Sequence, residues 1–242
     1  MVNSIYKNAR RIISAVHTTI IRSTPELRKI RKIIQDPQRR PSSTGLVAQR
    51  NDQVFIRRLQ TNPVALRMSF WENHFELKSL SSYPEISGRI LDFGCGSGHL
   101  DILLARSGKS IHGIDMSTIG INIANALRSE ENEAVQSRLS FAVVDITREL
   151  PKVAKFDSAW SAHVFEHIAD PGPIFAGLKN WLKSGAYILI SVPLGHAYDD
   201  PDHVNHFFHV EELRSFLAGH IRVIKIDTSY EYEVMRALCR LD

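Results

Sequence analysis

This sequence of 242 residues has little cysteine, no long apolar run and no complete dinucleotide-binding glycine pattern. Its two cysteines, Cys95 and Cys239, cannot form a disulfide framework, so a reducing cytoplasm is the expected compartment. No apolar run approaches the roughly 18 residues that a membrane-spanning helix needs. Because 43% of the residues are hydrophobic, the chain can bury one substantial core, which favours one α/β domain with an appendage.

Positive charge is concentrated at the N-terminus. The first 50 residues carry 3 Lys and 8 Arg against Glu26 and Asp36, a net charge of +9, whereas the other 192 residues carry 19 basic and 24 acidic residues, a net charge of −5. Apolar residues recur at helical spacing over 12–21 and 27–34, among the basic ones. Such a helix can pack on the domain or on a second subunit, lie on an anionic membrane, or belong to a mitochondrial targeting peptide. Nucleic-acid binding is not expected, because interleaved aromatic residues and a recognised binding fold are lacking.

Proline, serine and glycine between 37 and 45 indicate a linker. We therefore predict a basic helical arm over 1–45, a helical lid over 46–85 and a ligand-binding domain over 86–242. The lid is expected to cover the pocket.

The most informative stretch is Ile90 to Leu100, in which a short apolar run enters three glycines and leaves into a helical pattern. A strand, a tight turn and a helix start in this order form a nucleotide-binding cradle in α/β proteins. Counting from Gly94, the sixth position is His99 instead of the glycine that a nicotinamide dinucleotide site needs. Asp92 before the turn and Asp115 after the next strand offer carboxylates, which suit a cationic amino-acid group and a ribose diol better than a pyrophosphate.

Strand and helix patterns alternate through the remaining chain, which predicts a parallel sheet with helices on both faces. After a helix over Glu211 to Leu217, an edge pair is expected to close the sheet. In such sheets, ligands bind beyond the carboxyl ends of the strands. The expected strands are Arg89–Phe93, Ser110–Ile114, Leu139–Val144, Asp157–Trp160, Ala186–Val192, Ile221–Ile226 and Glu233–Arg240.

These ordered motifs resemble the class I S-adenosylmethionine-dependent methyltransferases, especially the small-molecule branch that includes quinone-biosynthesis O-methyltransferases. The resemblance spans roughly Arg89 to Phe216 and implies a Rossmann-like, seven-stranded, mostly parallel sheet with an antiparallel last strand. It implies that Asp115 binds both ribose hydroxyls, that Asp145 and the backbone N–H of Ile146 bind adenine, and that Met116 packs on the adenine ring. Asn62-Pro63 with Arg67 is similar to a stretch of the quinone-pathway enzymes, so Arg67 is expected at the cofactor carboxylate. The full set assigned to S-adenosylmethionine is Arg67, Asp92, Gly94, Gly96, Gly98, Asp115, Met116, Asp145, Ile146 and Ala162.

Histidines are the candidate general bases. The segment 199–209 follows the fifth predicted strand, where the family's acceptor pocket lies, and His203 and His206 are the first candidates in it. His163 is a third, because it follows Ala162 near the methyl donor. The alternatives are that His206 and His209 anchor this loop, or that its histidines and aspartates bind a metal ion; no metal is assigned, because the ligand pattern of catechol-type enzymes is not evident.

The function expected from these features is methyl transfer from S-adenosylmethionine to a hydroxyl of a small molecule, quinone or glycan. A methyltransferase-like scaffold without turnover is a second hypothesis, because Ala162 and His163 depart from the residues common in relatives. A nicotinamide-dependent oxidoreductase is a third, which the missing glycine disfavours. The expected location is the cytoplasm, with peripheral membrane contact or the mitochondrial matrix as alternatives.

Overall fold

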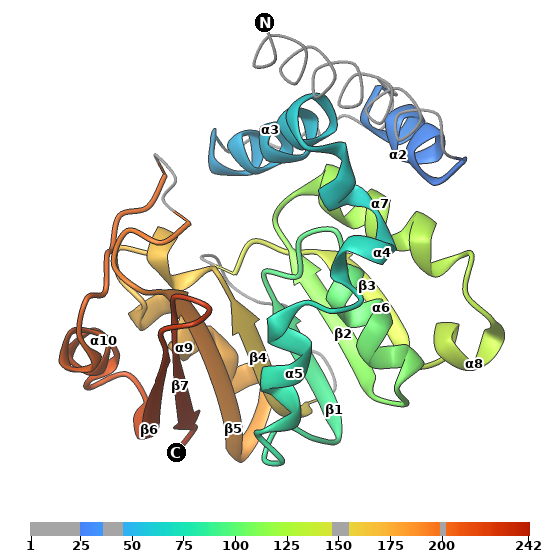
Figure 1. The fold of residues 1–242 in the computed structure, drawn as a ribbon. Coiled ribbons are helices and arrows are strands. Elements are labelled where there is room, and N and C mark those ends of the chain that lie inside the picture. Colours follow the sequence, from blue (N-terminus) through green and yellow to red (C-terminus); the bar gives the residue numbers. More distant parts are fainter. Residues whose placement is uncertain (1–24, 36–45, 147–154, 199–201) are drawn as a thin grey trace, which may run out of the picture.

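The computed structural model describes residues 25–35, 46–146, 155–198 and 202–242. The linker predicted over 37–45 and the first amphipathic run lie outside these ranges. The described chain forms one seven-stranded sheet in the order β3-β2-β1-β4-β5-β7-β6, flanked by helices (Figure 1). The strands are β1 (Arg89–Phe93), β2 (Ser110–Asp115), β3 (Leu139–Val143), β4 (Phe156–Ala162), β5 (Leu182–Pro193), β6 (Arg222–Ser229) and β7 (Val234–Arg240).

The first five strands pair in parallel, and β7 pairs antiparallel with both β5 and β6. The predicted fold class is therefore confirmed, with the reversed last strand inserted between its two neighbours. The predicted fifth strand starts at Ala186, whereas β5 starts at Leu182, which pairs with Phe156 of β4 ahead of a bulge. The polar residues 183–185 are typical of a loop, so the sequence pattern does not indicate this first part of the strand.

Helices lie on both faces of the sheet. Neighbouring residues of a strand point to opposite faces, and apolar side chains on both faces are buried under helices. Ile90 belongs to one hydrophobic cluster and Leu91 to another, and both side chains are buried. The first cluster also contains residues of α2, α6 and α7, and the second residues of α9 and α10. These helices are α2 (Pro25–Gln35), α6 (His99–Arg106), α7 (Thr118–Arg128), α8 (Glu133–Gln136), α9 (Gly172–Trp181) and α10 (Val210–Leu217).

The helices that precede the sheet lie over one edge and one face of it. In Figure 1, α3 lies above the ends of the central strands, and α2 lies beside it over α7. The region predicted as one helical lid is broken into four pieces, because Pro63 starts a short 3-10 helix and Arg67 is extended. The pieces are α3 (Leu46–Thr61), η2 (Pro63–Leu66), α4 (Met68–Trp71) and α5 (Phe75–Ser81).

The second amphipathic run forms α2, and its apolar stripe packs inside the molecule. Leu27, Ile30, Ile33 and Ile34 are each at most 5% exposed, and α2 contacts α7. For this run, packing on the domain is the correct interpretation, because a buried stripe is unavailable to a lipid surface. Within the described ranges, no helix has the length and apolar character needed to cross a bilayer.

Candidate active site

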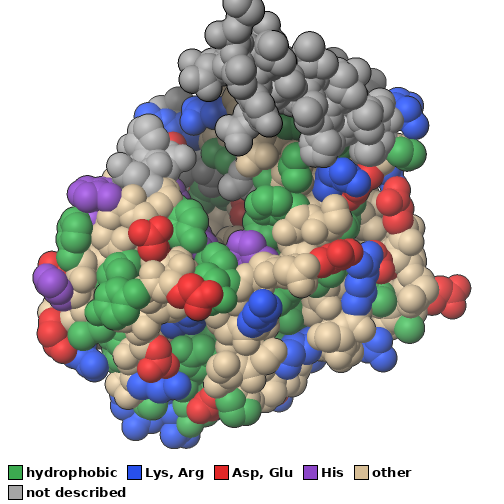
Figure 2. Space-filling model, viewed as in Figure 1, with side chains coloured by type: hydrophobic (Ala, Val, Ile, Leu, Met, Phe, Trp, Pro, Cys, Tyr) green, Lys and Arg blue, Asp and Glu red, His purple; other side chains and the backbone are tan. Residues whose placement is uncertain are grey.

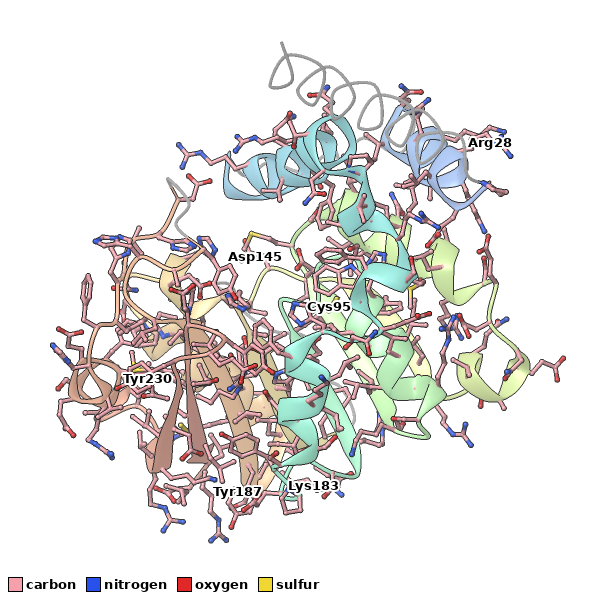
Figure 3. The ribbon with its side chains drawn as sticks, in the orientation of Figure 1. Arg28, Cys95, Asp145, Lys183, Tyr187 and Tyr230 are labelled. Atoms are coloured by element: carbon pink, nitrogen blue, oxygen red, sulfur yellow. The ribbon has the colours of Figure 1, made fainter. Side chains whose placement is uncertain are left out.

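The structure brings the predicted cofactor residues that lie at the ends of strands to one edge of the sheet. β3, β2, β1 and β4 are consecutive neighbours, so the residues that follow them lie next to one another at their carboxyl ends. Figure 3 shows Cys95 of the glycine loop and Asp145 after β3 at this edge, beneath α3. The space-filling view has a hollow in the same place, with a histidine side chain at its rim (Figure 2).

The glycine loop connects β1 to α6, and its conformation requires residues without side chains at particular positions. Gly94, Gly96 and Gly98 all have positive φ angles, of 90°, 57° and 68°. A Cβ atom on Gly94 would lie 2.1 Å from Cγ2 of Val164, and one on Gly98 would lie 2.5 Å from Cζ of Phe141. At Gly94 and Gly98, the backbone therefore runs too close to its neighbours for a side chain.

Asp115 is the link between the glycine loop and β2. Its Oδ2 accepts a hydrogen bond from the backbone N–H of Gly96 (2.9 Å), and its Oδ1 accepts one from the N–H of Ser117 (2.7 Å). Burial raises the pKa of Asp115, and these two N–H groups oppose that shift. The carboxylate is thus held at the strand end with lone pairs left for a ligand, as the ribose-binding role requires.

Asp92 and Asp101 form a buried carboxyl pair below the loop. Asp92 is 5% exposed and Asp101 is fully buried. Burial raises the pKa of both groups; the charge of Asp92 adds to the rise at Asp101, and the contact with Asp101 opposes the rise at Asp92. Because a second negative charge is disfavoured in so buried a place, the pair holds a proton to higher pH than a free carboxyl group would.

The other predicted cofactor residues stand around this core of the site. Asp145 and Ile146 follow β3, Ile146 is buried, and Ala162 ends β4. Met116 follows Asp115 directly. Arg67 follows Leu66, whose carbonyl oxygen contacts Nε2 of His99 at the start of α6 (3.1 Å). The Nε atom of Arg67 lies 3.9 Å from Oε2 of Glu26. The roles of these residues stay predictions.

His163 follows β4 in a left-handed backbone conformation, with φ of 57°. Its Nδ1 is 3.5 Å from Oε1 of Glu166, and its Nε2 is 3.9 Å from Oε1 of Glu76. Both glutamates are only 1% exposed, whereas the histidine side chain is 30% exposed. An accessible imidazole therefore lies between two buried carboxylates at the edge where the cofactor residues meet.

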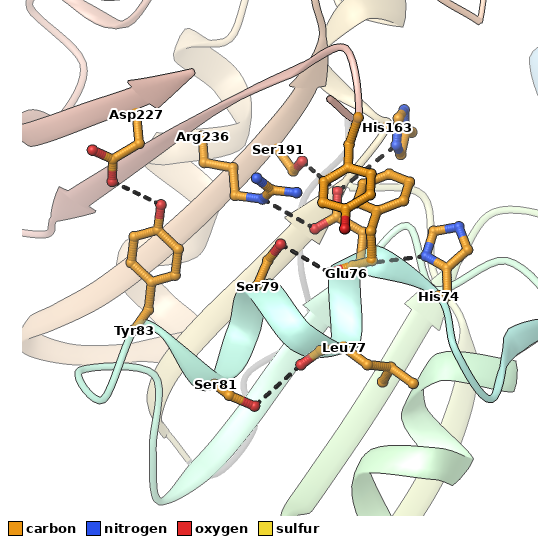
Figure 4. A network of polar contacts seen from close by, with 12 residues as sticks. His74, Glu76, Leu77, Ser79, Ser81, Tyr83, His163, Ser191, Asp227 and Arg236 are labelled. Carbon is orange, nitrogen blue, oxygen red and sulfur yellow. Dashed lines mark hydrogen bonds and ion pairs between the residues drawn. The ribbon is translucent and has the colours of Figure 1, made fainter. Parts of the chain in front are cut away.

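Glu76 is part of a buried polar network that sequence reasoning missed (Figure 4). Its Oε1 accepts a hydrogen bond from the hydroxyl of Ser191 (2.6 Å), and its Oε2 accepts one from Nε of Arg236 (3.3 Å). These partners come from α5, β5 and β7, so the network ties the lid region to the sheet. The sequence carries no signal for it, since a lone glutamate in a short helix reads as a solvent-exposed residue.

The loop after β5 carries the other candidate bases, His203 and His206, whose ring centres lie 6.0 Å apart. The ring of His203 lies 4.7 Å from that of His167, and the ring of His206 lies 4.5 Å from that of His196. Ligand atoms of Glu166, His167 and His203 lie within 4.8 Å of one another, close enough for a metal ion to bridge. His209 precedes α10, where Glu212 accepts hydrogen bonds from the N–H groups of 208 and 209, which agrees with an anchoring role for the end of this loop.

A groove of about 760 Å³ opens between this loop and the turn that joins β6 to β7. Tyr198 lines it, and the Tyr198 ring also meets the ring of His163 edge to face at 5.5 Å. Its hydroxyl donates to the carbonyl oxygen of Tyr232 (3.0 Å), which fixes the ring. Tyr198 therefore links the groove to His163, which does not itself line the groove. Its lining residues are Leu194, Gly195, His196, Ala197, Tyr198, Phe208, His209 and Glu233.

This strand order, with a glycine loop after β1 and an acidic residue after β2, defines the class I fold of S-adenosylmethionine-dependent methyltransferases. The chain belongs to the methyltransferase domain family, whose model matches residues 68–228. Its cofactor is therefore S-adenosylmethionine, and the glycine loop with Asp115 fits this group.

Several relatives are ubiquinone biosynthesis O-methyltransferases. The enzyme of Paraburkholderia phymatum is 31% identical over 120 residues, which cover 49% of this chain and 50% of that protein. The one of Xylella fastidiosa (strain 9a5c) is 33% identical over 120 residues, 49% of this chain and 48% of that protein. The chain thus spans about half the length of these relatives.

Solved structures agree with the fold. A glycopeptide N-methyltransferase, MtfA, superposes with a TM-score of 0.57 over 69% of this chain and 95% of its own, at 15% identity. A SAM-dependent methyltransferase from Aquifex aeolicus gives a TM-score of 0.58 over 72% of this chain and 93% of its own, at 18% identity.

Proposed function

We propose that this chain methylates a hydroxyl oxygen of a small acceptor molecule, with His163 as the group that takes the hydroxyl proton. The observation that carries the proposal is the position of His163, directly after β4 and between Glu76 and Glu166. The relatives named as O-methyltransferases support oxygen as the acceptor atom, and their quinone pathway favours a quinone-like acceptor over a glycan.

When bound, S-adenosylmethionine supplies an electrophilic methyl group on its sulfonium. Asp115 and Asp145 would hold the nucleoside, and the glycine loop would set its depth. An acceptor in the groove beside Tyr198 would present its hydroxyl near His163. His163 would take up the hydroxyl proton, so that the oxygen could accept the methyl group that the cofactor supplies. An imidazolium formed there would lie beside two carboxylates, which stabilise its charge.

His163 is preferred to His203 and His206 because of where each ring lies. Its backbone continues the sheet, since its N–H donates to the carbonyl oxygen of Ser191 (2.9 Å). His203 and His206 belong to the loop after β5 and face His167, His196 and each other. A left-handed backbone costs a non-glycine residue roughly 1–3 kcal/mol, a cost that is common at functional sites.

The test uses two measurements on one set of variants. Calorimetry with S-adenosylhomocysteine should show binding by the wild type and by His163→Asn, and at least tenfold weaker binding by Asp115→Ala. Incubation of cell extract with radiolabelled S-adenosylmethionine should label small molecules with the wild type but at least a hundredfold more slowly with His163→Asn. Full labelling by that variant would overturn the role of His163. Binding without any labelling would favour a scaffold without turnover.

A further inference from the structure

Asp52, on the inner face of α3, has a carboxylate that the fold satisfies only in part. The residue is 3% exposed. Its Oδ1 accepts hydrogen bonds from the hydroxyl of Ser117 (2.6 Å) and from the backbone N–H of Ile119 (2.9 Å). Its Oδ2 is buried and accepts no hydrogen bond from any residue that the structure describes.

Asp52 lies next to the predicted ribose site. The same Ser117 that donates its hydroxyl to Asp52 donates its backbone N–H to Oδ1 of Asp115. One residue therefore bridges the two carboxylates. The charge of Asp52 contributes to raising the pKa of Asp115, which agrees with their proximity.

One turn further along α3, Phe55 covers the glycine loop. A Cβ atom on Gly96 would lie 3.7 Å from Cζ of Phe55, and one on Gly120 would lie 2.9 Å from its Cε2. The Phe55 side chain is 5% exposed. Residues 52 and 55 share one helix face, so this face of α3 lies against both loops that form the cofactor site.

A purely structural role explains only one of the two carboxylate oxygens of Asp52. The bonds to Ser117 and Ile119 cap the start of α7, and Oδ1 alone makes them. A buried acceptor without a donor costs about 1–3 kcal/mol, and a buried polar group of this kind calls for an explanation such as a ligand. The ribose of S-adenosylmethionine carries two hydroxyl donors, and both oxygens of Asp115 already accept one backbone N–H each.

We propose that Oδ2 of Asp52 accepts a hydrogen bond from a ribose hydroxyl of bound S-adenosylmethionine, so that α3 supplies a second carboxylate to the cofactor site. This inference rests on cofactor binding, as in the proposed function, but not on the acceptor or on His163. α3 then forms one wall of the site, and cofactor binding and the docking of α3 stabilise each other.

The direct test is calorimetry with S-adenosylhomocysteine on the full chain. Asp52→Asn keeps an oxygen for Ser117 and Ile119 but replaces the charged second oxygen with a donor. We expect at least tenfold weaker binding and an unchanged melting temperature without ligand. Gln53→Ala is the matched control, because residue 53 lies on the same helix with an exposed side chain; we expect an unchanged melting temperature and less than a threefold change in affinity.

The 2′-deoxy and 3′-deoxy analogues of S-adenosylhomocysteine identify the contact. With one of them, the ratio of the wild-type affinity to the Asp52→Asn affinity should fall close to one. Asp52→Ser provides the same ratio if the asparagine variant proves unstable. Equal binding of S-adenosylhomocysteine by the wild type and Asp52→Asn, or a ratio that persists with both analogues, would overturn the assignment of Asp52 alone. A wild type that binds no S-adenosylhomocysteine would overturn the proposed function with it.

Discussion

At the scale of single residues, the site depends on positions where the backbone or a buried charge leaves no freedom. Gly94 combines a φ of 90° with a neighbour, Val164, in the space that a side chain would take. Gly108 has a similar φ of 94°, but nothing described lies within 4 Å of a Cβ placed there. Substitutions at these two glycines therefore distinguish the cost of backbone strain from the cost of a steric clash.

We expect Gly94→Ala to lower the free energy of unfolding by more than the roughly 1–2 kcal/mol of a left-handed alanine, and to weaken S-adenosylhomocysteine binding at least tenfold. Gly108→Ala should cost only the strain and leave binding unchanged. Adding Val164→Ala to Gly94→Ala should restore part of the lost stability, because Cγ2 is removed. Chemical denaturation and calorimetry measure both effects, and equal costs for the two glycine variants would contradict this account.

The carboxyl pair of Asp92 and Asp101 predicts a pH dependence. Both pKa values are raised in the folded chain, so the folded state holds more protons than the unfolded state above about pH 4. The free energy of unfolding should therefore fall as the pH rises from 4 towards the raised pKa values. Asp101→Asn leaves a single ionisable group, and its amide can donate to Asp92. We expect denaturation curves for this variant to depend less on pH and to show about 1–3 kcal/mol more stability at pH 8. Parallel pH profiles would contradict the raised pKa values of this pair.

At the scale of secondary-structure elements, the periodicity of α2 identified an apolar stripe, but periodicity is silent about what covers it. The structure places that stripe against α7, inside the protein. For α5, the sequence predicted helix, yet the network of Glu76 with Ser191 and Arg236 joins residues more than a hundred positions apart. Such partners follow from packing, which a local pattern does not encode.

The position of α2 leads to a test of its role. Ile30 is 1% exposed, so Ile30→Ala should lower the free energy of unfolding by about 2–5 kcal/mol, as for other buried aliphatic truncations. Arg28→Ala, on the exposed side of the same helix, should change it by less than about 0.5 kcal/mol. If the stripe instead served a bilayer, Ile30→Ala would leave stability intact and reduce flotation with anionic vesicles.

At the scale of the whole molecule, the proposed cofactor site draws on four strand ends and on α3 above them. Ligand binding should therefore stabilise the folded chain as a unit. S-adenosylhomocysteine at a hundred times its dissociation constant adds about 2.7 kcal/mol, which corresponds to a rise in melting temperature of about 5–10 °C for a domain of this size. Thermal unfolding with and without ligand measures this shift. On ligand binding, hydrogen exchange should slow in α3 as well as in the glycine loop. Unchanged exchange in α3 would show that this helix is not part of the binding site.

The fold class, and the edge of the sheet at which we expect the cofactor, could both be predicted from the sequence. Alternating strand and helix patterns and short motifs at strand ends are local signals, and parallel sheets collect such motifs at one edge. Only the tertiary structure distinguished His163 from the loop histidines, buried the stripe of α2, and brought Asp52 and Glu76 to the site. These features depend on contacts between segments far apart in the chain, because a side chain's partner and its burial are decided only when the elements pack.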